Sequence, residues 1–158
     1  MRVSVCNRQR GCAVDMAAVK RLVRGLAEFA SAHMSESTPW QEVTIHLLDD
    51  AGIAPVNLAI MGHEGATDVI TQRYEPIPGE PDGLTGELFV NVQYARTKAM
   101  RRAGWSVDRE FALYLAHGCD HLSGADDHTP RERAAMRRRE LAWLKRLPLT
   151  PLFQNDIL

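Results

Sequence analysis

The chain has 158 residues, 45% of them apolar, with 19 basic and 20 acidic side chains. This length predicts one domain over residues 1–158, and the apolar share is enough to bury a core. The formal net charge of −1 points neither toward nor away from a nucleic-acid partner. Because no apolar run approaches the roughly 20 residues that a membrane-spanning helix needs, we expect no membrane partner.

The cysteine content and the first residues indicate the compartment. Cys6, Cys12 and Cys119 are too few, and odd in number, for a disulfide framework, which favours a reducing environment. The opening stretch MRVSVCNRQRG lacks the apolar core of a secretion signal. We therefore expect a cytoplasmic protein.

The first half of the chain alternates the patterns of strands and helices. Apolar residues alternate with polar ones around Val3 and Val43, whereas after Asp15, which can cap a helix, they recur every three or four positions. The Pro- and Gly-rich stretch EPIPGEPDG predicts an exposed loop. We expect strands over 3–5, 42–48, 68–71 and 86–92, a helix over 16–33, and a short helix over 56–61.

The second half has the pattern of helices with clear ends. Gly124 is suited to end one helix, and Thr129, Pro130 and Glu132 form a capping box with proline at the first helical position. We expect helices over 94–102, 107–122 and 130–146. Strands interleaved with helices predict the class α/β (α+β): a single compact domain with a small four-stranded mixed sheet packed with about five helices.

Charge is distributed unevenly along the chain. Residues 49–87 contain eight acidic side chains and one basic one, whereas residues 129–146 contain seven basic and two acidic ones. The basic last helix is a candidate contact for an RNA backbone, and a solvated charged face explains it equally well. The acidic segment would repel RNA if it lined the same cleft.

Residues 117–128, HGCDHLSGADDH, hold the strongest chemical pattern. His117 and His121 are four apart on the predicted helix, which places both imidazoles on one face. Gly124 then lets the chain fold back, so that His128 can supply a third nitrogen. Three protein ligands leave a position for water, as in catalytic zinc sites, and metal-bound water ionises near neutral pH. The pattern predicts a zincin-like site on a helix for one divalent metal ion, with zinc expected.

The same stretch has other interpretations. A polar, solvated loop is the competing explanation for the histidines. Gly118 stands where a zincin protease has its general-base glutamate, which disfavours a peptide or amide hydrolase. We expect Cys119 to serve in packing, Asp120 to be exposed and solvated rather than a ligand or its partner, and His46 to be a strand residue.

The histidine cluster and two upstream segments resemble the YbeY family of rRNA maturation ribonucleases. The family signature is H-G-x-x-H-L-x-G-x-D-H, and this chain carries its histidines, both glycines and the Asp-His ending. Upstream, Asn57 followed by TDVIT at 67–71 is similar to the family's L-N-…-T-D-V-L-S-F segment, and GELFV at 86–90 is similar to its G-D-I-x-I strand. The resemblance covers roughly residues 40–145.

The resemblance implies an α/β metalloprotein with three histidine ligands. It implies single-strand-specific endoribonuclease activity in rRNA maturation, at the 3′ end of small-subunit rRNA, and in ribosome quality control. The implied partners are rRNA or the small ribosomal subunit, with ribosome-associated proteins. No catalytic side chain is assigned: metal-bound water would do the chemistry, and Asp126 is our candidate for a residue that orients a ligand.

Two departures from the family pattern bear on the site. The family has five residues between its second and third histidines, whereas six separate His121 from His128, and Asp127 occupies the expected place. Asp127 is therefore the alternative third ligand. The family arginine, four residues after the asparagine, is replaced by Met61, which cannot neutralise phosphoryl charge. That replacement favours the alternative function, a non-catalytic ribosome-assembly factor with a bound metal.

Overall fold

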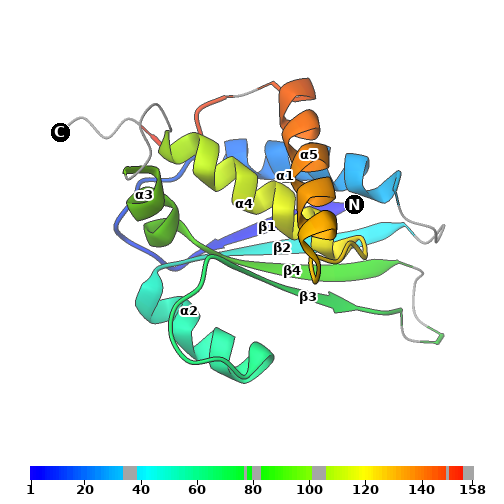
Figure 1. The fold of residues 1–158 in the computed structure, drawn as a ribbon, viewed down its shortest axis with the longest axis horizontal. Helices are drawn as coiled ribbons and strands as arrows, with labels where there is room; N and C mark the ends of the chain where they lie inside the picture. Colours follow the sequence, from blue (N-terminus) through cyan, green and yellow to red (C-terminus); the bar gives the residue numbers. More distant parts are fainter. Residues whose placement is uncertain (34–38, 77, 80–82, 101–105, 149, 155–158) are drawn as a thin grey trace.

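The computed structural model, drawn in Figure 1, describes residues 1–33, 39–76, 78–79, 83–100, 106–148 and 150–154. Its elements, in chain order, are β1 (Arg2–Asn7), α1 (Met16–Ser31), β2 (Trp40–Leu48), α2 (Asp50–Val56), a π-helical turn η1 (Asn57–Met61), β3 (Val69–Tyr74), β4 (Leu84–Asn91), α3 (Val92–Met100), α4 (Val107–Leu122) and α5 (Pro130–Arg146).

The four strands form one mixed sheet in the order β1-β2-β4-β3. β1 pairs with β2 and β2 with β4 in parallel, while β3 runs antiparallel along the outer edge of β4. Ile45 of β2 is registered with Val5 on one side and Leu88 on the other. The expected class, a compact α/β domain with a small mixed sheet and five helices, is confirmed.

Helices cover the two faces of the sheet unequally. Figure 1 shows α1, α4 and α5 on one face and α2 on the other. The large core lies under α1 and α4, where Leu26, Leu88 and Phe111 are fully buried. A small second core beneath α2 consists of Leu48, Ile53 and Ile70, with Val56 and Phe89 packed against it. No described helix has the length and apolar character needed to cross a membrane.

Two glycines allow α4 to lie directly on β4. A Cβ on Gly118 would lie 2.3 Å from a methyl carbon of Leu88, and a Cβ on Gly86 would lie 3.0 Å from a methyl carbon of Leu122. A side chain at position 118 would therefore force the buried Leu88 or the helix itself to shift, whereas one at position 86 would need Leu122 to move by a few tenths of an ångström. The glycine that follows His117 thus fixes the height of the histidine-bearing helix above the sheet.

The helix caps agree with the sequence patterns. Asp15 accepts a hydrogen bond from Ala18 N at 3.1 Å, and Thr129 Oγ1 accepts one from Glu132 N at 3.1 Å. Gly124 adopts φ +102° directly after α4, the left-handed conformation in which glycine commonly ends a helix. The predicted starts of α1, α4 and α5 and the stop after α4 are confirmed.

Three helices differ in their bounds from expectation, and the helix expected over 16–33 ends at Ser31. The helix expected over 56–61 begins earlier, at Asp50, because Asp49 caps it by accepting from Gly52 N at 2.8 Å. Pro55 lies inside α2, and the chain continues as the wider turn η1. The helix expected over 94–102 begins at Val92, and positions 101–102 lie outside the described residues, as do 77 and 80–82 of the expected exposed loop.

Candidate metal centre

The last turns of α4 bring two imidazoles together. His117 and His121, one helical turn apart, place their Nε2 atoms 3.1 Å from each other. The ring centroids are 4.5 Å apart and the rings are nearly perpendicular, at 82°. Both side chains are partly exposed, at 29% and 23% of their surface, so the paired nitrogens are accessible from solvent.

The other nitrogen of each ring is held by an acceptor. His117 Nδ1 lies 2.9 Å from Glu140 Oε2 of α5, and His121 Nδ1 lies 2.9 Å from the carbonyl oxygen of Ala125. Carboxylate and carbonyl oxygens only accept, so each Nδ1 carries the hydrogen and each Nε2 presents a lone pair. Two lone pairs 3.1 Å apart repel each other unless a proton, forming an Nε2–H···Nε2 hydrogen bond, or a metal ion lies between them. A hydrogen bond from the other ring nitrogen to a carboxylate or carbonyl oxygen is the usual way in which a metal-ligating histidine is oriented.

Asp127 completes a triangle of ligand atoms. Its Oδ2 lies 3.4 Å from His121 Nε2 and 3.7 Å from His117 Nε2. Around a tetrahedral ion with bonds of about 2.0–2.2 Å, two ligand atoms are separated by about 3.3 Å. The residues present therefore fit a zinc-sized ion. Because the Asp127 side chain is 38% exposed, one side of the triangle remains open to water or substrate.

The two candidates for third ligand, Asp127 and His128, differ in where the structure places them. His128 is 80% exposed, and its Nε2 lies 3.5 Å from Asp126 Oδ1 rather than in the triangle. The main chain of Asp127 is fixed from α5, where Arg133 Nη1 donates to its carbonyl oxygen at 3.1 Å. Of the two candidates, the described structure brings Asp127, the alternative third ligand, into the triangle, and it places Asp126 beside His128.

The expectation of a solvated Asp120 is wrong. Asp120 is buried and accepts two hydrogen bonds from Arg139 of α5, at 3.1 and 2.9 Å. α5 packs over this side of α4 and removes the carboxylate from water. Burial raises the pKa of Asp120 although Arg139 opposes the shift. Cys119 is buried as expected, and burial raises the pKa of its thiol to about 12.

Glu140 is the functional residue that sequence reasoning missed. It is fully buried on α5 and reaches His117 from 23 residues away. One signal was available: Glu140 lies midway between Met136 and Leu144, four residues from each, on the buried side of α5. An acid in the apolar stripe of an otherwise basic helix needs a polar partner.

The electrostatic field at the triangle favours positive charge. Burial by itself lowers the pKa of His117, but the hydrogen bond that His117 donates to Glu140 and the charges of Glu140, Asp127 and Asp68 outweigh it, so the pKa is raised. His117 binds a proton more tightly than a free histidine side chain in water does. The same negative surroundings attract a divalent cation in place of the proton.

Two arginines donate to main-chain oxygens at or next to the ligand residues. Arg73 of β3 donates to the carbonyl oxygen of Leu122, the last residue of α4, at 3.4 Å, which places a guanidinium one residue from His121. Arg133 donates to the carbonyl oxygen of Asp127. Met61, at the position of the family arginine, is a 52% exposed side chain on η1.

Comparisons with known proteins show the family to which the chain is similar. The family described as Endoribonuclease YbeY matches residues 4–148. A protein named Endoribonuclease YbeY from Pelotomaculum thermopropionicum is 36% identical over 154 residues, covering 95% of this chain and 99% of that one. The protein of the same name from Rhodopirellula baltica is 37% identical over 115 residues, 72% of this chain and 58% of its own length.

A solved structure shares the fold. The solution structure of a protein from Thermotoga maritima aligns with a TM-score of 0.58 at 18% identity, covering 92% of this chain and 87% of the other. At this identity the likeness concerns the architecture alone. The mixed sheet and the helix that bears the histidines are therefore features of a fold that is already known.

Proposed function

Because the chain belongs to the endoribonuclease YbeY family, we propose that it is a metal-dependent, single-strand-specific endoribonuclease. Its proposed role is rRNA maturation, at the 3′ end of small-subunit rRNA, and ribosome quality control. Membership of a family named for RNA cleavage supports a hydrolase that acts on phosphodiester bonds. The observation that carries the metal dependence is the convergence of two imidazole lone pairs, 3.1 Å apart, beside Asp127.

His117, His121 and Asp127 would hold the ion, with zinc as the expected metal. When bound there, a divalent ion supplies a Lewis acid that activates water and polarises a phosphate. Glu140 keeps the hydrogen of His117 on Nδ1 and aims its Nε2 at the centre. The Ala125 carbonyl does the same for His121, so both rings are oriented before a substrate arrives.

The substrate backbone would be bound by cations next to the triangle. Arg73 and Arg133 each contact a residue at or beside a ligand, and Arg131, Arg137 and Arg138 are exposed along α5. Arginine suits phosphate because its planar donors can bind two oxygens at once. The proposed partners are rRNA or the small ribosomal subunit, with ribosome-associated proteins, in the cytoplasm.

Cleavage of a labelled single-stranded RNA by zinc-loaded protein tests this function. We expect the wild-type protein to cut the single strand faster than a duplex of the same sequence, and His117→Ala to abolish cutting. His46→Ala is the matched control, because His46 also bonds to a glutamate yet lies outside the triangle. Cleavage that survives in His117→Ala would show that the activity does not come from this site.

A second candidate function is a ribosome-assembly factor that binds metal without cutting RNA. The exposed Met61 at the arginine position is the observation that favours it. This candidate predicts that metal-loaded protein binds the small subunit and leaves RNA intact. Met61→Arg separates the two functions: cleavage gained only in the variant supports the assembly factor, and cleavage already present in the wild type supports the nuclease.

A further inference from the structure

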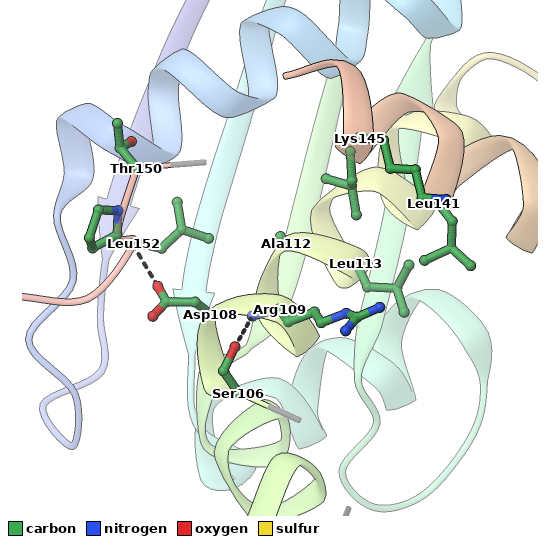
Figure 2. A pocket seen from close by; sticks show the side chains of 11 residues that line it. Ser106, Asp108, Arg109, Ala112, Leu113, Leu141, Lys145, Thr150 and Leu152 are labelled. Carbon is green, nitrogen blue, oxygen red and sulfur yellow. Dashed lines mark hydrogen bonds between the residues drawn. The ribbon is translucent and has the colours of Figure 1, made fainter. Parts of the chain in front are cut away.

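Two hollows flank residues 150–152, where the chain passes the N-terminal half of α4. The larger one, about 440 Å³, lies between this segment, α4 and α5 (Figure 2). The smaller one, about 110 Å³, lies between the same segment and α1. We propose that the two hollows together are a docking site for an acidic, leucine-bearing segment of a partner protein.

The larger hollow has an apolar lining. Figure 2 shows Ala112 and Leu113 of α4 between Leu152 on one side and Leu141 on the other, and Leu144 completes this surface. None of the described residues that line either hollow is a ligand of the metal centre. Apolar side chains of a partner would leave water here, which is the main driving force for association.

The ridge between the hollows is fixed in place. Leu152 N donates to Asp108 Oδ1 at 2.6 Å, the bond drawn dashed in Figure 2. On the other side of the chain, Asp15 N donates to Leu152 O, and Gln154 N donates to Ala13 O, both at 2.8 Å. The hollows are therefore formed before a partner arrives, and a preformed site spends little binding energy on ordering itself.

The charges on the rim indicate an acidic partner. Arg109 of α4 and Lys145 of α5 line the larger hollow, and Arg21 of α1 lines the smaller one. Asp108 is the acidic residue among the described lining residues, and its carboxylate already accepts from Leu152 N. Lys145 and Arg21, on two helices beside an apolar surface, complement a segment that carries both leucines and carboxylates.

The division into two hollows favours a peptide over a small molecule. A small ligand fills one enclosed space, commonly about 300–1,000 Å³, and the smaller hollow is well below this range. A peptide can instead place separate side chains on both sides of the Thr150–Leu152 ridge. Leucine is the anchor expected for the smaller hollow, because it is compact and apolar.

Binding of a designed peptide tests the proposal. The probe is a fluorescein-labelled peptide with leucines at helical spacing and glutamates between them, followed by polarisation with chelator present, so that the metal centre plays no part. We expect saturable binding that Lys145→Glu weakens about tenfold or more, whereas Arg137→Glu, an exposed α5 cation outside the hollows, changes it less than about twofold. Methyl NMR signals of Leu113, Leu144 and Leu152 should shift during the titration.

Several outcomes would overturn the proposal. Equal weakening by Lys145→Glu and Arg137→Glu would mean that the peptide senses only overall charge. Equal binding by a control peptide with serine in place of leucine would mean that the apolar lining is not used. Octanoate that shifts the same methyl signals when the peptide does not would assign the hollows to a small carboxylate, and absence of binding by either would remove the docking site.

Discussion

Among the described residues, two histidines are bonded to glutamates, and one of these pairs lies in the candidate metal centre. His117 of α4 bonds to Glu140 at 2.9 Å, and His46 of β2 bonds to Glu87 of β4 at 2.6 Å. The other ring nitrogen of His117, Nε2, faces the imidazole of His121. The ring of His46 instead stacks on Phe89, with ring centroids 4.6 Å apart. Its partner Glu87 also accepts a hydrogen bond from the Tyr74 hydroxyl.

The difference comes from the periodicity of the backbone. Four residues along a helix return to the same face one turn away, so His121 meets His117. Along a strand the nearest residues on the same face are two positions away, and for His46 these are Thr44 and Leu48. A histidine held by a carboxylate is therefore prepared for metal binding only where the fold supplies further ligands.

The largest effect on metal binding should come from losing the second imidazole. His121→Ala removes one of the three ligand atoms. Zinc affinity should fall by more than about 100-fold, because losing a direct ligand costs more than losing a residue that orients a ligand. His46→Ala should bind zinc like the wild type. Titration with a competing chelator measures both, and a comparable loss in His46→Ala would contradict the distinction between the two pairs.

The third ligand should show the next largest effect. Asp127→Asn should weaken zinc binding by about 100-fold, whereas the exposed His128→Ala should change it by less than about twofold. Elemental analysis of the purified variants, together with the same chelator titration, gives the result. The opposite ranking would restore His128 as the ligand and show that the loop rearranges when metal binds.

A smaller effect is expected from the glutamate behind His117. Glu140→Gln keeps an oxygen near His117 Nδ1 but removes the charge, so zinc affinity should fall by about tenfold, the low end for such partners. Glu87→Gln changes the corresponding group of the other pair and should leave zinc affinity unchanged. If Glu140→Gln binds zinc normally, the glutamate serves packing of α5 rather than orientation of His117.

The sequence was informative about the site where local spacing decides the structure. The histidine pair, the stop at Gly124 and the cap at Thr129 each depend on residues within one or two turns. The choice between Asp127 and His128 depends on the path of the loop, which one inserted residue alters. Glu140 and the burial of Asp120 depend on how α5 packs on α4, a contact between distant segments that no local pattern specifies.

The smallest effect should be the pH dependence of stability in the metal-free protein. The raised pKa of His117, above its ordinary 6.5, means that the folded state binds a proton more tightly than the unfolded chain does. The resulting stabilisation is fully present below about pH 6.5 and is lost as pH rises through the folded-state pKa. Zinc-loaded protein should show the opposite trend, because the ion must displace that proton. Urea unfolding at several pH values, with chelator and then with zinc, measures both slopes. His117→Gln should flatten the metal-free slope, and a slope that stays unchanged in this variant would assign the proton to another group.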